Sequence, residues 1–125
     1  MRFGYTILYV GDVGASVDFY ERAFGLTRRF VHDSGQYAEL ETGSTALAFA
    51  AHELAAENVP GLPRPEGDRA GFEVCFVTED VGAGYSRAVE AGAVPVSEPA
   101  TKPWGQEVAY VRDPDGVLVE IASPD

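Results

Sequence analysis

Two glutamates lie in short apolar runs, a setting in which a carboxylate has unusual chemistry. Glu120 stands within Val117-Leu-Val-Glu-Ile-Ala122, and Glu73 stands within Phe72-Glu-Val-Cys-Phe76. Both runs are typical of β-strands, whose side chains alternate between two faces, so each glutamate shares its face with small or apolar neighbours. A carboxylate enclosed in this way must be paired, hydrogen-bonded or protonated. Both residues are therefore candidates for contacting a ligand, and the alternative is a structural glutamate satisfied by a tyrosine or a backbone N–H.

The single tryptophan, Trp104, lies between two strand-like runs. Pro103 and Gly105 flank it and favour a loop. A tryptophan in a loop has no strand or helix to pack it, which favours a ligand-stacking or lid role, with simple packing as the alternative. Aromatic residues on the strand-like runs supply further candidates for a cavity wall, because aromatic pockets suit flat organic ligands. These candidates are Tyr5, Tyr37, Phe49 and Tyr110.

Other catalytic patterns are missing from the sequence. There is no Gly-x-Ser-x-Gly elbow, no phosphate-cradling glycine loop and no evident Cys/His pair. The one cysteine, Cys75, lies in an apolar run, which predicts a buried small side chain and no disulfide. His32 and His52 are expected at the surface. No catalytic residue is assigned.

Length and charge narrow the class of protein. The chain has 125 residues, 46% of them apolar, which fits one domain with a real core. Its net charge of −11, with only 9 basic residues, argues against nucleic acid as a partner. The acidity serves solubility or, alternatively, attracts cationic ligands. No signal peptide or membrane-spanning run is evident, so we expect a cytoplasmic protein.

An internal repeat organises the chain. Residues 4–20 and 71–87 each contain a β-rich run, the sequence Asp-Val-Gly-Ala and then a helical apolar pattern. Asp12 and Asp80 are expected to be the N-caps of the two helices. Gly25 and Gly92 occupy positions that favour left-handed C-caps. The pattern predicts a duplicated structural unit.

Three short strand-like runs follow each helix. They cover residues 28–32, 36–41 and 45–50 in the first half, and 94–97, 106–111 and 117–122 in the second. Each half therefore reads as a βαβββ unit, 1–50 and 70–125, within a single α+β domain. Residues 51–69 form the linker, with a short helix expected over 52–57 before a Pro- and Gly-rich stretch. One unit leaves a sheet face uncovered, which predicts that two units pair, either in one compact domain or in a dimer that exchanges units.

Two stretches of the chain resemble a known superfamily. The opening, Tyr5–Leu26 with its Asp-Phe-Tyr helix, and the close, Tyr110–Ile121 with Asp-Pro-Asp-Gly before a glutamate, are similar to those of vicinal oxygen chelate proteins. These include glyoxalase I, bleomycin-resistance proteins and extradiol dioxygenases. The resemblance implies paired βαβββ units whose eight strands form a curved mixed sheet around a cavity. In the enzymes of the superfamily, four strands each supply one ligand to a divalent metal.

The four metal-ligand positions of the superfamily fall on Tyr5, Ala48, Glu73 and Glu120. Two carboxylates remain there, and both histidines have been replaced. A phenol ligates divalent metals poorly unless it is ionised, which requires a pH near 10. Alanine has no donor atom, whereas protein metal sites normally keep three protein ligands or more. We therefore predict no tightly bound transition metal and no other cofactor, with weak Mg²⁺ or Ca²⁺ binding by the two carboxylates left open.

The resemblance without the metal ligands favours a non-enzymatic protein of the bleomycin-resistance type. Such a protein would sequester an aromatic antibiotic or natural product in clefts of a homodimer. A cationic aromatic molecule is one such ligand. The residues expected to contact it are Trp104, Tyr5, Glu73, Glu120, Tyr37, Phe49 and Tyr110. One alternative is a metal-dependent lyase, isomerase or dioxygenase of the glyoxalase type, and another is a subunit with a structural or interaction role only. We expect no nucleic acid or membrane partner.

Overall fold

A computed structural model describes residues 3–64 and 72–124 of the chain. Its contacts divide the chain into two compact units. The first comprises Met1–Glu21 and Gly25–Arg64, and the second comprises Arg22–Phe24 and Pro65–Asp125. Each unit is described by itself below. The second part of the expected linker, residues 65–69, lies outside the described residues.

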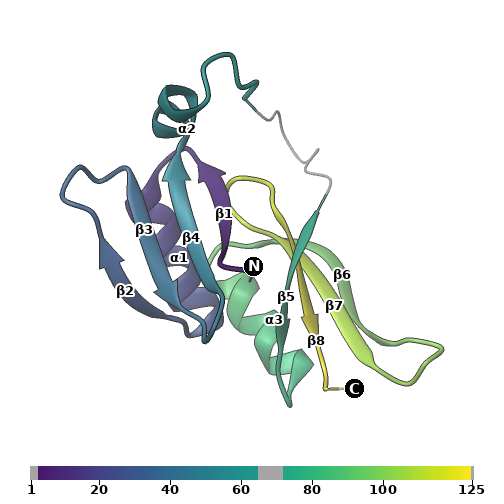
Figure 1. Ribbon diagram of the computed structural model, residues 1–125. Helices are drawn as coiled ribbons and strands as arrows, with labels where there is room; N and C mark the ends of the chain where they lie inside the picture. Colours follow the sequence, from purple (N-terminus) through teal and green to yellow (C-terminus); the bar gives the residue numbers. More distant parts are fainter. Residues whose placement is uncertain (1–2, 65–71, 125) are drawn as a thin grey trace. The chain divides into compact units, whose positions relative to one another are not determined.

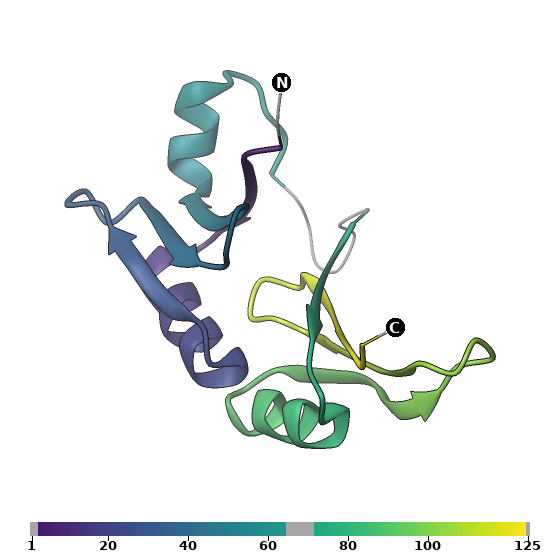
Figure 2. The ribbon, with the colours of Figure 1, turned by 60° about the horizontal axis from the view of Figure 1, so that its bottom comes forward.

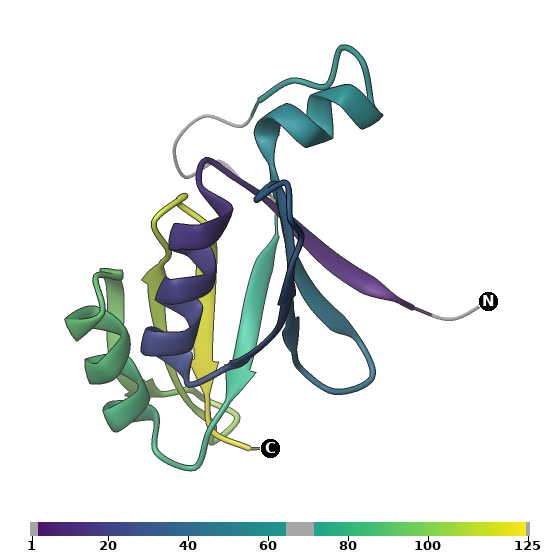
Figure 3. The same cartoon turned by 90° about the vertical axis from the view of Figure 1, so that its left-hand side faces the viewer.

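The first unit contains one four-stranded sheet, sheet 1 (Figure 1). Its elements are β1 (Tyr5–Val10), α1 (Val13–Phe24), β2 (Thr27–Val31), β3 (Tyr37–Glu41), β4 (Ala46–Ala51) and α2 (His52–Asn58). The strand order is β1-β4-β3-β2, with β1 parallel to β4 and the other neighbours antiparallel. This arrangement confirms the predicted order of elements, and strand bounds agree within one residue. The short helix α2 follows β4 directly (Figure 3).

Helix α1 begins and ends where the sequence predicts. The Asp12 carboxylate accepts a hydrogen bond from the Ala15 backbone N–H at 3.0 Å, which satisfies an otherwise unpaired donor of the first turn. Gly25 ends the helix in the left-handed conformation, with φ of 68°. Val17 and Tyr20 are fully buried on the face between these caps, and the Tyr20 ring contacts Phe49 of β4. These contacts fix α1 against one face of sheet 1.

The second unit repeats this connectivity (Figure 2). Its elements are β5 (Glu73–Val77), α3 (Val81–Glu90), β6 (Val94–Thr101), β7 (Glu107–Arg112) and β8 (Leu118–Ala122). They form sheet 2 in the order β5-β8-β7-β6, with β5 parallel to β8. The α+β class and the βαβββ repeat are confirmed. The eight described strands form two four-stranded mixed sheets.

Asp80 caps α3 as predicted, but the end of this helix differs from the expectation. The Asp80 side chain accepts from the Ala83 N–H at 3.0 Å. The C-cap is Ala91 in a right-handed conformation, and Gly92, with φ of 110°, follows it. Gly84 lets α3 approach the sheet closely, because a Cβ there would lie 3.2 Å from Ile121 Cγ2. A side chain at Gly84 would crowd β8.

Strand β6 is longer than predicted, reaching Thr101 where the sequence suggested an end near Ser97. Pro95 and Pro99 make a strand of this length unexpected from the sequence, because proline has no N–H to donate to a β-ladder. They are tolerated here because β6 is an edge strand whose pairing with β7 shifts register twice.

In each described unit, one face of the sheet packs against the long helix that follows the first strand. In β1 the alternation is plain: Leu8 and Val10 are buried, whereas Tyr5, Ile7 and Tyr9 are exposed. We call the faces bearing Tyr5 and Glu73 the open face of sheet 1 and the open face of sheet 2. The polar candidate residues lie on these faces. No helix in the described residues is long and apolar enough to cross a bilayer.

Candidate functional site

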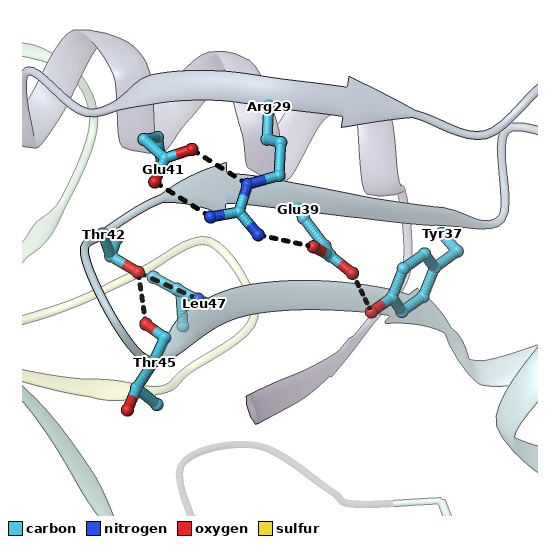
Figure 4. A network of polar contacts seen from close by, with 7 residues as sticks. All are labelled: Arg29, Tyr37, Glu39, Glu41, Thr42, Thr45 and Leu47. Atoms are coloured by element: carbon cyan, nitrogen blue, oxygen red, sulfur yellow. Dashed lines mark hydrogen bonds and ion pairs between the residues drawn. The ribbon is translucent and has the colours of Figure 1, made fainter. Parts of the chain in front are cut away.

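A polar network occupies the open face of sheet 1 (Figure 4). Arg29 donates to both oxygens of Glu41, from Nε and Nη2, each at 2.9 Å. Its Nη1 donates to Glu39 Oε1 at 3.2 Å, and the Tyr37 hydroxyl donates to Glu39 Oε2 at 2.8 Å. Arg29 reaches both carboxylates because it sits at a register shift in β2, between Arg28 and Phe30. One guanidinium thus serves two carboxylates.

Burial and charge shift the pKa values of Tyr37, Glu41 and Arg29 in this network. Burial, the hydrogen bond to Glu39 and the nearby Tyr5 raise the pKa of Tyr37 to about 12, so its hydroxyl keeps its proton. Arg29 holds the pKa of the Glu41 carboxyl below its usual value, chiefly through their hydrogen bonds. Glu41 in turn raises the pKa of Arg29. Glu39 is only 8% exposed, so it is a buried carboxylate held by two donors.

The open face of sheet 2 brings Glu73 and Glu120 together. A side-chain hydrogen bond to Glu73, burial and the Glu73 charge all raise the pKa of Glu120, and Lys102 opposes them. Tyr110 lies directly across the ladder from Glu120, and burial together with both glutamates raises its pKa. The Glu120 carboxyl therefore holds its proton more tightly than an isolated glutamate does. Three of the expected contact residues are thus neighbours.

The Glu73–Glu120 pair predicts a specific pH dependence of stability. A carboxyl whose pKa is raised by folding binds its proton more tightly in the folded chain, so the free energy of unfolding falls as pH rises through that raised pKa. Glu120→Gln should weaken this fall, because the amide is neutral at every pH. Urea unfolding at pH 4 and pH 8 measures the effect, and Glu98→Gln, at an exposed position of β6, is the control. An equal fall in both variants and in the unaltered chain would contradict the prediction.

Trp104 lies in the hairpin loop between β6 and β7, as expected, and is 69% exposed. Its indole Nε1 donates to Gln106 Oε1 at 3.0 Å, and Gln106 Nε2 donates to the Ser123 carbonyl at 2.7 Å. The indole is therefore tethered at one edge while its faces remain accessible. Its part in binding stays a prediction.

Two predictions about single residues are wrong. Phe49 is fully buried against Tyr20 on the helix side of sheet 1, so it belongs to the core and not to an open face. Cys75 is exposed on the open face of sheet 2, not buried, because its strand leaves alternate side chains accessible. Of the histidines, His32 is exposed as expected and His52 is half-buried.

The four positions that would bind a metal do not fit one. In the first unit, Tyr5 offers a phenol and Ala48 no donor at all. In the second unit, Glu73 and Glu120 offer two carboxylates, fewer than the three protein ligands that a metal site normally keeps. The residues described by the structure contain no cluster of three or more His, Cys, Asp or Glu side chains able to hold a metal ion.

Comparison with known proteins establishes the family. Residues 2–121 match the sequence profile of the Glyoxalase/Bleomycin resistance protein/Dioxygenase superfamily. The chain belongs to this superfamily, which confirms the resemblance seen in its opening and closing motifs.

Individual relatives agree with this assignment. The chain is 33% identical over 117 residues to the uncharacterized protein YraH of Bacillus subtilis, covering 91% of each chain. It is 24% identical to a probable lactoylglutathione lyase of Vibrio cholerae, covering 96% of this chain and 88% of that protein. A glyoxalase-related enzyme from Fulvimarina pelagi has the same fold, with a TM-score of 0.87 and 24% identity over 99% of this chain and 88% of that one.

Proposed function

We propose that this protein is a non-enzymatic binder of the bleomycin-resistance type that sequesters an aromatic antibiotic or natural product in the cytoplasm. One observation carries the proposal: the open faces present accessible aromatic side chains beside carboxylates that already have hydrogen-bond partners. Tyr5 is 57% exposed and lies near Tyr37, which holds Glu39. Aromatic walls with a few fixed polar groups are what a planar organic ligand requires.

The proposal includes a homodimer whose clefts form where the βαβββ units of two chains meet. An open sheet face with exposed apolar side chains is unfavourable in water unless something covers it. Tyr9 on sheet 1 and Val77 on sheet 2 are such side chains. Sedimentation equilibrium at micromolar concentration should give a dimer, and a clean monomer would overturn this part of the proposal.

The test uses protein purified without a histidine tag. Because Trp104 is the only tryptophan, its fluorescence reports directly on the β6–β7 loop. Titration with aromatic antibiotics and flavins should quench this fluorescence in a saturable way. Metal analysis after dialysis should find no stoichiometric Zn²⁺, Ni²⁺ or Fe²⁺. Absence of saturable binding across the panel would reject the proposal.

A metal-dependent lyase of the glyoxalase type is the second candidate. The adjacency of Glu73 and Glu120 favours it, as does the similarity to the probable lactoylglutathione lyase of Vibrio cholerae. This candidate requires a stoichiometric transition metal that is lost in Glu73→Gln and Glu120→Gln. It also requires turnover of the hemithioacetal of glutathione and methylglyoxal. Either result would favour the enzyme over the binder.

A further inference from the structure

Sheet 1 has no carboxylate at Ala48, the position that corresponds to Glu120 of sheet 2, but it has one on the neighbouring strand, at Glu39. In sheet 2, Glu120 of β8 faces Tyr110 of β7 across the ladder. In sheet 1 the corresponding pair is Ala48 of β4 and Glu39 of β3. Residues paired in this way share a sheet face, so Glu39 replaces on the neighbouring strand the carboxylate that Ala48 lacks.

Small side chains lie beside Glu39 on the open face of sheet 1. Ala46, Ala48 and Ala50 of β4 pair with Tyr5, Ile7 and Tyr9 of β1 on one side, and Ala48 and Ala50 pair with Glu39 and Tyr37 of β3 on the other. The small methyl groups thus lie between rows of larger side chains. Phe30 of β2 extends the aromatic wall, with its ring centroid 6.0 Å from that of Tyr37.

The charge of this face is not balanced. Arg29 is the only cation in the hydrogen-bonded network, whereas Glu39 and Glu41 are both carboxylates. The network therefore carries a net charge of −1, and its more buried carboxylate is the one with the weaker, single contact to Arg29. Burying a carboxylate without full compensation is unfavourable. Each carboxylate oxygen can accept two hydrogen bonds, so Glu39 retains capacity for a further donor.

We propose that Glu39 is the anchor for an organic cation bound on the open face of sheet 1, with Arg29 and Tyr37 as positioning residues. A protonated amine or iminium beside Glu39 offsets the excess negative charge of the network. Tyr5, Tyr37 and Phe30 offer ring faces to the same cation, and such contacts add to the attraction. This inference rests on the proposed function and narrows its ligand to planar aromatic cations.

The probes are 9-aminoacridine, which is protonated at pH 7, and acridine, which has the same ring system and is neutral at that pH. Isothermal titration of the unaltered protein should show about tenfold tighter binding of 9-aminoacridine, the size expected for one partly desolvated cation contact. Glu39→Gln should abolish this preference while leaving acridine affinity within about twofold. Glu41→Gln removes the same charge at a more exposed position and is the matched control, which should keep most of the preference.

Two other outcomes distinguish the failure of this inference from that of the proposed function. If both probes bind with equal affinity, or if Glu39→Gln keeps the preference, the Glu39 anchor is wrong while aromatic binding stands. If neither probe binds, both ideas fail for planar aromatic ligands. Tyr37→Phe provides a second variant should Glu39→Gln fold poorly, because it removes one donor from Glu39 and should change the preference without changing the charge.

Discussion

Replacing Trp104 by alanine should weaken binding of a planar aromatic ligand by roughly thirtyfold, because truncating an aromatic anchor commonly costs about 2 kcal/mol or more. The indole is largely exposed and bonded only at its Nε1 edge, so its flat faces are available for stacking. The midpoint of thermal unfolding should hardly change, since the side chain contributes little to the core. Ligand titration by calorimetry and a thermal melt of the same sample measure both quantities.

Trp104→Phe is the matched control for this prediction. It keeps an aromatic face and loses the N–H, so it should retain part of the affinity. If Trp104→Ala unfolds the protein and spares binding, Trp104 is a packing residue and the stacking interpretation fails.

The largest loss of stability should come from Phe49→Ala, which should lower the free energy of unfolding by about 3–5 kcal/mol. The Phe49 ring is inaccessible to solvent and contacts Tyr20, so its removal leaves a cavity between β4 and α1. Urea unfolding followed by circular dichroism measures the change.

Phe30→Ala tests whether burial, rather than aromatic character, sets this loss. Phe30 is on the same sheet but 40% exposed, and its ring contacts Tyr37 on the open face. Its truncation should cost well under half as much as that of Phe49. Equal losses would mean that the open face of sheet 1 is as tightly packed as the helix side.

The fold was predictable because its signals are local. Asp12 and Asp80 indicate where the two helices begin, because an aspartate at this position can accept a hydrogen bond from a backbone N–H three residues later. The alternation in β1 likewise identifies its buried face. The face of Phe49 could not be predicted in the same way. Strand β4 is buried on both faces, so its sequence shows no alternation of apolar and polar residues.

The candidate site was only partly predictable. Glu73 and Glu120 stand out as charges in apolar runs, and the structure brings them together. Glu39 was missed because it alternates with Ala38 and Leu40 as an ordinary solvent-facing strand residue would. In the structure Glu39 is buried and bonded to Arg29, which lies at a shift in strand register. No pattern along the sequence indicates that shift.

The paired aspartate caps have an evolutionary consequence. Asp12 and Asp80 make the same 3.0 Å hydrogen bond in both halves, which is the trace that duplication of a half-length gene would leave. The helix side of each sheet holds its unit together, so a substitution there costs stability, whereas the opposite side can change at little cost to the core. The two descendants could then acquire different surface chemistry, a carboxyl pair in one and an arginine-held carboxylate in the other, without either losing its core.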